Sequence, residues 1–274
     1  MILCQLTDLH LRPPGKMAYG RVDTNRCFAE AVDQLLKLQP APDAYLLTGD
    51  LTDSGRADEY AVLADGIARL DKPVYLMPGN HDNCAGLRAA FPAHAYLAAP
   101  ADAPADAAPD CVQYRVDLDG TALIALDTVV PGQPHGALDA ARLAWLAGHL
   151  DQTTPTIIAM HHPPFATGIA HMDRIGLMHG AAELEALMSK HHNIERVLCG
   201  HLHRSIQARF ANTIASTCPS TAHQISLALA ADAQSSYCLE PPGYQLHTWQ
   251  GGRLVTHTGV FGDFAGPLPF RDPA

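Results

Sequence analysis

Basic residues are scarce in this sequence, and their scarcity limits the partners that the protein can bind. Eighteen Lys and Arg stand against 28 Asp and Glu, which gives a formal net charge of −10. A surface of this charge repels the phosphates of long nucleic acids unless cations gather locally. No uncharged apolar run reaches the roughly 18 residues that a membrane-spanning helix requires. We therefore expect neither a binder of long nucleic acids nor a membrane protein.

Paired cysteines and several widespread catalytic motifs are missing as well. The seven cysteines lie far apart and include no CxxC pair, a pattern typical of proteins that keep their thiols reduced. Residues 1–10 lack the basic start and long apolar stretch of a secretory signal, so we expect a cytoplasmic protein. The absence of GxGxxG, GxxxxGKS/T, GxSxG and HExxH disfavours dinucleotide-binding, P-loop, serine-hydrolase and zincin functions.

Short apolar runs, in contrast, are frequent, and 47% of the 274 residues are hydrophobic, enough for a sizeable core. Five runs have the length of buried strands: residues 2–6, 44–48, 73–77, 156–160 and 196–199. Amphipathic helices are predicted after the first two runs, with Asp23 or Thr24 as the cap of the first helix, and also after Asp139 and Ala181. This alternation predicts an α/β fold whose mostly parallel sheet has helices outside it.

The remaining segments predict antiparallel hairpins. Asp119-Gly120 joins residues 112–118 to 121–127, and Gly251-Gly252 joins 243–249 to 253–259. We expect both hairpins in a second sheet, and an exposed linker over residues 98–109, which are rich in Ala, Pro and Asp. The predicted organisation is a catalytic core over 1–210, followed by strands over 211–274 that complete the second sheet and offer a candidate cap or oligomerisation segment.

Polar side chains follow each of the five apolar runs almost at once. They are Asp8 and His10, then Asp50, then Asn80 with His81 and Asp82, then His161 and His162, and finally His201 and His203. The carboxyl ends of parallel strands share one edge of a sheet, so these residues are expected to converge. Imidazole with carboxylate favours Zn, Fe, Mn or Co over Ca or Mg. Seven ligands exceed the need of one ion, which indicates two ions bridged by a carboxylate at about 3.5–4 Å.

The blocks DLH, GDLTDSG, GNHD, HHPP and GHLH, in this order over residues 8–203, resemble the calcineurin-like metallophosphoesterase superfamily. The segments DLHLRPPGKMAYGRVDTN, GRADEY, MHHPP and PSTAHQ resemble its class III phosphodiesterases, which include glycerophosphodiesterases and cyclic-nucleotide phosphodiesterases. The resemblance implies a four-layer αββα sandwich, two β-sheets flanked by helices. It also implies a binuclear enzyme that hydrolyses small phosphodiesters, 3′,5′-cyclic nucleotides such as cAMP or glycerophosphodiesters, by attack of a metal-bound hydroxide.

The resemblance further assigns roles by position. One ion would be held by Asp8, His10 and His203, the other by Asn80, His161 and His201, and Asp50 would bridge them. His161 matches the family ligand better than His162, which would make a supporting hydrogen bond. His81, held by Asp82, would contact the phosphate or protonate the leaving oxygen. His223 in PSTAHQ is a candidate substrate contact, the alternative being a supporting hydrogen bond.

Several simpler interpretations stay open. The same two-ion core serves phosphomonoesterases, and a nuclease or a metal-free scaffold are less favoured alternatives. Asp53, Asp127 and Asp173 are expected to be structural, and Tyr19 and Arg12 are candidates for substrate contact, although Arg12 could only solvate a loop. Assembly into a homo-oligomer is a hypothesis by analogy. Nine histidines outside the blocks are expected at the surface or in loops: His94, His135, His149, His171, His179, His191, His192, His247 and His257.

Overall fold

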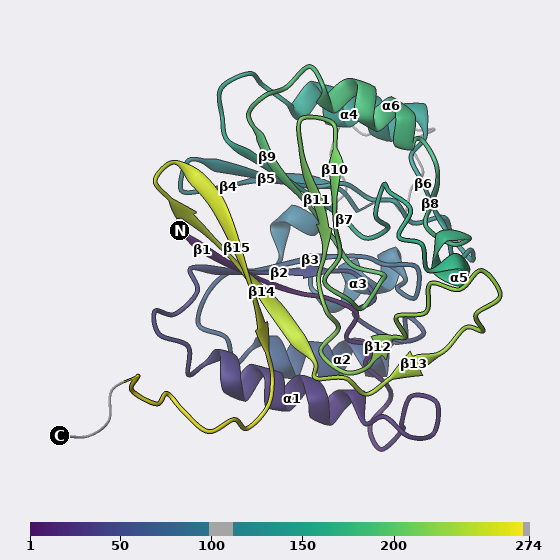
Figure 1. The fold of residues 1–274 in the computed structure, drawn as a ribbon, viewed down its shortest axis with the longest axis vertical. Helices are drawn as coiled ribbons and strands as arrows, with labels where there is room; N and C mark the ends of the chain where they lie inside the picture. Colours follow the sequence, from purple (N-terminus) through teal and green to yellow (C-terminus); the bar gives the residue numbers. More distant parts are fainter. Residues whose placement is uncertain (99–111, 271–274) are drawn as a thin grey trace.

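The computed structural model describes residues 1–98 and 112–270, and it has two sheets packed face to face between helices (Figure 1). The five-stranded sheet has the order β15-β14-β1-β2-β3. Its strands are β1 (Ile2–Leu6), β2 (Ala44–Thr48), β3 (Val74–Met77), β14 (Gly243–Gln250) and β15 (Arg253–Val260). In this sheet β1, β2 and β3 are parallel, whereas β14 runs antiparallel to both β1 and β15.

The six-stranded sheet has the order β10-β11-β9-β7-β5-β4. Its strands are β4 (Tyr114–Leu118), β5 (Thr121–Ala125), β7 (Thr156–Met160), β9 (Ile194–Cys199), β10 (Gln207–Phe210) and β11 (Thr213–Thr217). The four central strands are parallel, and the edge strands β4 and β10 are antiparallel to their neighbours. Both sheets are thus mixed, each built around the parallel strands that the apolar runs predict.

Alternation of side chains along the central strands separates the layers of the core. Leu123 and Ala125 of β5 join the apolar cluster that contains the first sheet, whereas Ile124 packs in a second cluster with Leu146 and Leu184 of the outer helices. Successive residues of a strand point to opposite faces, so one sheet contributes to both clusters. The four-layer αββα sandwich is confirmed.

The four predicted helices are present and cover the outer faces. They are α1 (Thr24–Leu35), α2 (Ala57–Ile67), α4 (Ala140–His149) and α6 (Ala181–Met188). Helices α1 and α2 lie on the five-stranded sheet, and α4 and α6 on the other (Figure 1). Of the two candidate caps of α1, Asp23 is the N-cap and accepts a hydrogen bond from the Arg26 amide at 3.0 Å. An Asp at this position satisfies a backbone N–H that the helix leaves free.

Both predicted hairpins form, but the expectation that they share one sheet is wrong. Asp119 and Gly120 take positive φ angles of 54° and 80° between β4 and β5, and this hairpin lies in the six-stranded sheet. The hairpin β14–β15 instead extends the five-stranded sheet beside β1. Of the strands that the structure describes between residues 211 and 270, only β11 belongs to the second sheet. Hairpin pattern and turn chemistry specify local pairing but carry no information about which distant strand the hairpin joins. The predicted linker 98–109 lies almost wholly outside the described residues.

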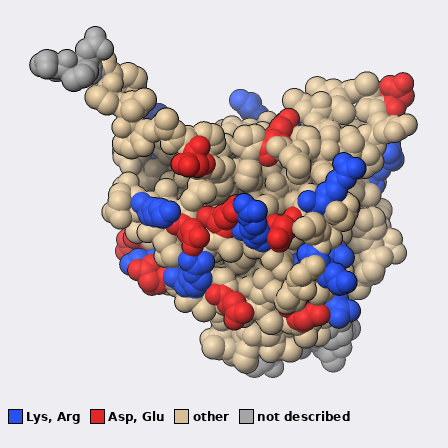
Figure 2. Space-filling view, turned by 90° about the horizontal axis from the view of Figure 1, so that it is seen from below, with Lys and Arg blue, Asp and Glu red and all other residues tan. Residues whose placement is uncertain are grey.

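Short elements complete the described structure. They are α3 (Cys84–Ala90), a 3₁₀ turn (Ala95–Leu97), β6 (Gly136–Ala137), α5 (Ala170–Asp173), β8 (Leu177–His179), β12 (Gln224–Ile225) and β13 (Tyr237–Cys238). Within the described ranges, no helix combines the length and apolar character needed to cross a bilayer. On the face shown in Figure 2, acidic and basic side chains are interleaved, with no broad basic area on that side.

Candidate metal centre

The residues after β1 and β2 run side by side beyond the ends of the strands. The Asp8 amide donates to the Gly49 carbonyl, and the His10 amide donates to the Asp50 carbonyl, both at 3.0 Å. On the second sheet, the Gly200 amide donates to the His161 carbonyl at 3.0 Å. The ends of strands from both sheets therefore meet at one edge of the sandwich.

Backbone conformation marks this edge as unusual. Eight non-glycine residues have positive φ in the described chain, and five of them are predicted ligands: Asp8, His10, Asp50, His201 and His203. Such conformations cost about 1–3 kcal/mol each and persist where the surrounding structure enforces them, frequently at functional sites. The strain turns these side chains off the strands and toward one another.

The first group of converging side chains comes from β1, β2 and β9. The Nε2 atoms of His10 and His203 lie 3.1 Å apart. Oδ2 of Asp50 is 3.6 Å from Nε2 of His10, and Oδ1 of Asp8 is 3.5 Å from Nε2 of His203. All four residues are at most 4% exposed. Two imidazole nitrogens and two carboxylates are thus aimed at one small volume.

The second group shares Asp50 with the first. Nε2 of His161 lies 3.4 Å from Oδ2 of Asp50 and 3.2 Å from Oδ1 of Asn80. The His201 ring is 5.2 Å from the His161 ring, and its Nε2 is buried with no hydrogen-bond partner in the described residues. The seven predicted ligand residues therefore lie together, with the Asp50 carboxylate between two sets.

Hydrogen bonds on the far side of two imidazoles select their tautomers. Nδ1 of His161 donates to the Thr48 carbonyl at 2.8 Å, and Nδ1 of His203 donates to the His223 carbonyl at 2.9 Å. Each ring then presents an Nε2 lone pair to the centre, the arrangement that metal-ligating histidines commonly have. His162 differs, because the Thr128 hydroxyl contacts its Nδ1 at 2.8 Å and the Pro134 carbonyl its Nε2 at 3.3 Å. Both nitrogens of His162 are engaged by the protein, which supports a positioning role.

The ionisation of these groups reflects burial and their mutual charges. Burial raises the pKa of Asp8 to about 6. For Asp50, burial acts in the same direction, but His161, His81 and His10 outweigh it and hold the pKa well below its usual range. Burial and the neighbouring His161 lower the pKa of His201 to about 3, so this imidazole is neutral. Burial lowers the pKa of His161, but Asp50 and Asp8 outweigh it and raise the pKa to about 9. His201 therefore offers a free lone pair, whereas a metal ion at His161 would displace a proton.

This donor set fits divalent metal ions. Buried lone pairs that face one another at 3.1–3.6 Å are unfavourable unless a positive charge lies between them. Four compact groups of candidate ligand atoms lie at the centre or beside it: Asp8 with His10 and Asp50, His10 with His203 and His223, His161 with His162 and His201, and His10 with Asp53 and His81. Nε2 of His201 is buried and has no hydrogen-bond partner among the described residues. A bound metal ion would give this atom the partner that a buried polar atom requires.

His81 lies beside the centre, but the expectation that Asp82 holds its ring is wrong. Nδ1 of His81 donates instead to the Asp53 carbonyl at 2.9 Å. The Asp82 carboxylate accepts from the Thr52 hydroxyl at 2.9 Å and from three backbone amides at 2.9–3.1 Å, those of Leu51, Thr52 and Gly79. Asp82 thus ties the loop after β2 to the loop after β3. Sequence adjacency suggested the wrong partner because the chain turns between residues 81 and 82.

The other candidates have separate surroundings. His223 is 1% exposed, and neither ring nitrogen has a hydrogen-bond partner among the described residues. Its ring lies 5.5 Å from that of His10. Arg12 forms an ion pair with Asp53, so its guanidinium is already engaged by a side chain of the protein itself. Tyr19 lies against His223, with ring centroids 5.2 Å apart.

The expectation of surface or loop positions fails for two of the nine other histidines. His247 is fully buried in β14, and His171 of α5 is 8% exposed, whereas His191, 9% exposed, lies in the loop between α6 and β9. In β14 the polar residues at every second position face the layer between the sheets, so a pattern that normally marks the solvent side misleads.

Close approach of backbone to side chain explains one of the glycines in the blocks. A Cβ added to Gly79 would overlap the Asp50 carboxylate and lie 2.8 Å from Cε1 of His161. A residue with any side chain at this position would displace the shared carboxylate.

The sequence of this protein is similar to those of known phosphoesterases. The family model for calcineurin-like phosphoesterases matches residues 1–205, three quarters of the chain. The chain belongs to the calcineurin-like phosphoesterase family. The resemblance of the five blocks is thereby confirmed. A probable glycerophosphodiester phosphodiesterase GpdQ of Arcobacter nitrofigilis is 34% identical, over 98% of this chain and 97% of that protein. A cAMP/cGMP dual specificity phosphodiesterase of Mycobacterium tuberculosis is 34% identical, over 84% of this chain and 70% of its own length.

Solved structures support the fold of this family member. A dimetal phosphatase from Danio rerio gives a TM-score of 0.63 at 13% identity, with 96% of this chain and 99% of that one covered. At this identity the likeness concerns the fold alone.

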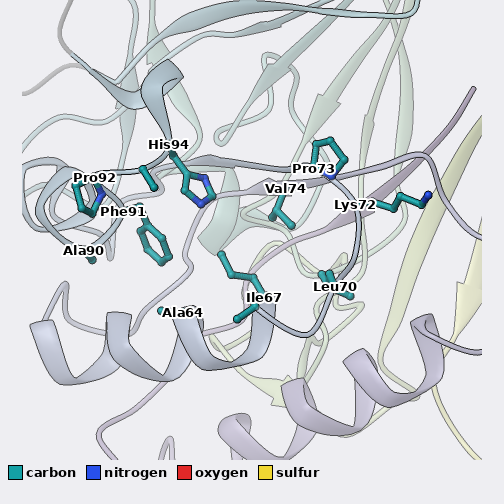
Figure 3. Close-up of a pocket in the computed structure, with 12 residues that line it drawn as sticks. Ala64, Ile67, Leu70, Lys72, Pro73, Val74, Ala90, Phe91, Pro92 and His94 are labelled. Atoms are coloured by element: carbon teal, nitrogen blue, oxygen red, sulfur yellow. The ribbon is translucent and has the colours of Figure 1, made fainter.

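A hollow of about 440 Å³, lined by apolar residues such as Ile67, Val74 and Phe91, lies between the end of α2 and the start of β3 (Figure 3). Its lining includes none of the predicted ligands, so it is distinct from the metal centre.

Proposed function

We propose that this protein is a binuclear metal-dependent phosphodiesterase that hydrolyses small phosphodiesters, either 3′,5′-cyclic nucleotides such as cAMP or glycerophosphodiesters. The observation that carries the proposal is the Asp50 carboxylate, which lies 3.6 Å from His10 and 3.4 Å from His161, between two sets of lone-pair donors. A shared carboxylate is what a two-ion site requires. The phosphodiesterases among the relatives support diesters as the substrate class.

The ligand assignment follows the two groups. One ion would be held by Asp8, His10 and His203, the other by Asn80, His161 and His201, and both by Asp50. Fe²⁺, Mn²⁺, Zn²⁺ or Co²⁺ suit this mixture of imidazole and carboxylate. When bound, such ions lower the pKa of coordinated water and offset the charge on phosphoryl oxygens.

The chain itself supplies the proton for the leaving group. The Nδ1–H of His81 is committed to the Asp53 carbonyl, so Nε2 is the atom that can deliver a proton. The His81 ring is exposed and lies 4.7 Å from the ring of His10, next to the first group. Its backbone amide donates to Oδ1 of Asp50 at 2.9 Å, which fixes its position relative to the shared carboxylate. We propose that His81 protonates the departing alkoxide.

Hydrolysis of bis(p-nitrophenyl) phosphate by protein loaded with Mn²⁺ or Co²⁺, with metal content measured, tests the proposal. We expect turnover of this diester, and a higher kcat/KM for it than for p-nitrophenyl phosphate. Fully loaded protein that leaves the diester intact would refute the phosphodiesterase proposal. A clear preference for the monoester would instead indicate a phosphomonoesterase.

Two variants separate metal binding from proton transfer. Asp50→Ala removes the shared carboxylate, and we expect loss of metal and of activity. His81→Ala leaves both ligand sets intact, and we expect unchanged metal content with a kcat lowered by about 10²–10⁴, the usual contribution of a general acid. Equal metal loss in both variants would show that His81 is itself a ligand.

We also propose assembly into a homo-oligomer through residues 211–274, and a cytoplasmic location. Support for assembly comes from exposed apolar side chains in this segment, among them Leu229, Leu239 and Leu268 at 63%, 68% and 75% exposure. Support for the location comes from the six cysteines of the described chain, all of which are free. Sedimentation equilibrium tests the first proposal: a monomer at micromolar concentration would contradict it.

A further inference from the structure

Tyr19 has the same unusual backbone conformation, a positive φ, as five of the predicted ligands. Among the non-glycine residues that the structure describes, positive φ is found besides the five predicted ligands at Asp119 and Ala211, which lie in β-hairpin turns, and at Tyr19, with a φ of 52°. Tyr19 lies at the tip of a tight turn closed by two hydrogen bonds between Ala18 and Val22, at 2.8 and 2.9 Å. A bulky side chain rarely takes this conformation unless its placement matters. The Tyr19 side chain is nevertheless 58% exposed.

The Tyr19 ring continues a row of rings that begins at the metal centre. His223 lies 4.7 Å from His203 and 5.5 Å from His10, measured between ring centroids. Tyr19 meets His223 edge-on at 5.2 Å and stacks on Tyr237 at 4.7 Å with an angle of 25°. Tyr237 also meets His223, at 5.4 Å. Burial raises the pKa of Tyr19, and the negative charge of Asp50 adds to the rise.

The hairpin that carries Tyr237 is bonded to the loop that contains the predicted ligand His203. Tyr237 belongs to the small hairpin β12–β13, where it pairs with Ile225. Arg204, the residue after the predicted ligand His203, donates to the Ile225 carbonyl at 2.6 Å and pairs with Glu240 at 2.7 Å. The buried side chains of Ala18 and Val22 form a small cluster against which Tyr237 packs. Two segments far apart in sequence are thus fixed beside the first metal group.

An exposed tyrosine ring stacked on a half-buried one and held in place next to a reaction centre suits a flat ligand group. Bases stack on aromatic side chains regardless of their sequence identity, because each base has a π-face. A small acyclic alcohol gains little from such a surface. We propose that Tyr19 and Tyr237 form an aromatic wall that receives the nucleobase of a diester substrate and makes the enzyme prefer cyclic nucleotides to glycerophosphodiesters. This inference rests on the proposed phosphodiesterase function.

The test compares kcat/KM for 3′,5′-cyclic AMP and glycerophosphoglycerol, a diester without a cationic group, in metal-loaded wild type, Tyr19→Ala, Tyr237→Ala and Tyr19→Phe. Met17→Ala is the control, because Met17 is an exposed residue of the same loop, at 49%. We expect the wild type to favour cyclic AMP. Each alanine variant should lower the ratio of the two values by roughly fivefold to 150-fold, the range for loss of one stacked base. Tyr19→Phe should have the wild-type ratio, and Met17→Ala should leave the ratio unchanged. The metal content should be the same in all of these proteins.

Equal losses on both substrates, or an unchanged ratio in both alanine variants, would refute the proposed aromatic wall.

Calorimetric titration of the same proteins with 5′-AMP and glycerol 3-phosphate provides a test that does not depend on turnover. We expect tighter binding of 5′-AMP in the wild type, and loss of that advantage in Tyr19→Ala. Loaded wild type that hydrolyses neither diester but shows this binding pattern would refute the proposed function and leave the wall standing. Equal affinity for the two ligands in the wild type would refute the wall whatever the activity.

Discussion

Gln5 connects three segments through one buried side chain, and its replacement by leucine should destabilise the fold strongly. Its amide nitrogen donates to the Thr48 hydroxyl at 2.9 Å and to the Cys199 carbonyl at 3.0 Å, and its oxygen accepts from Nε2 of His247 at 3.1 Å. Gln5, Thr48 and His247 are fully buried. The side chain therefore links β1 to β2, β9 and β14 in the layer between the sheets.

The magnitude follows from what each partner loses in Gln5→Leu. The N–H of His247 is left without an acceptor in a buried site, which costs about 1–3 kcal/mol. The Thr48 hydroxyl and the Cys199 carbonyl keep second partners, Leu6 and Cys218, so each loses only a net hydrogen bond of about 0.5–1.5 kcal/mol. The sum is a loss of about 2–6 kcal/mol in the free energy of unfolding, a large share of the 5–15 kcal/mol typical of a folded protein.

Urea unfolding in the presence of a chelator measures this loss without the contribution of bound metal. Gln250→Leu is the control, because Gln250 is exposed at the end of β14, and its change should stay within about 0.5 kcal/mol. The double variant Gln5→Leu/His247→Leu should recover part of the loss, since both partners are then apolar. A loss below about 1 kcal/mol for Gln5→Leu at an unchanged m-value would refute the reasoning.

Three further outcomes are expected. Burial lowers the pKa of His247 to about 3 from about 6.5, so the unfolded chain binds more protons between these values. The contribution of His247 to stability should therefore fall by up to about 1.4 kcal/mol per pH unit as pH drops below 6.5, and His247→Gln should flatten the overall slope by this amount; parallel pH profiles would contradict it. Gly79→Ala should lose metal, measured by elemental analysis, whereas Gly148→Ala, whose added Cβ meets nothing within 4 Å, should bind metal normally. Chelation should abolish activity, and Mn²⁺ or Co²⁺ should restore it; activity that survives complete metal removal would exclude a metal-dependent reaction.

The strand ends were predictable because two sequence signals coincide there. A buried parallel strand reads as an unbroken apolar run, and the polar residues that interrupt the sequence at its carboxyl end have few roles other than a site. Asp8, Asp50 and His161 follow such runs directly, and the structure brings them together. The four helices were predictable for a similar reason, since each has one apolar stripe.

Partners set by tertiary contact were not predictable. The carbonyl that orients His81 belongs to Asp53, and backbone atoms leave no residue-type signal in a sequence. Tyr237 lies in a two-residue strand without periodicity, so nothing in its neighbourhood indicates that it stacks on Tyr19. His247 was expected at the surface because alternation cannot distinguish a polar face turned to solvent from one that satisfies itself between two sheets.

The sequence distance between the grouped side chains governs when the centre can form during synthesis. The His201 amide donates to the carboxylate of Asp8 across 193 residues, so the ribosome must add that whole stretch before the two can meet. At about 5–20 residues per second this takes roughly 10–40 s. β1, made among the first residues, then still awaits its neighbour β14. The predicted ligand set can accordingly be complete only after His201 has been synthesised, and a chain interrupted before that residue lacks part of the set.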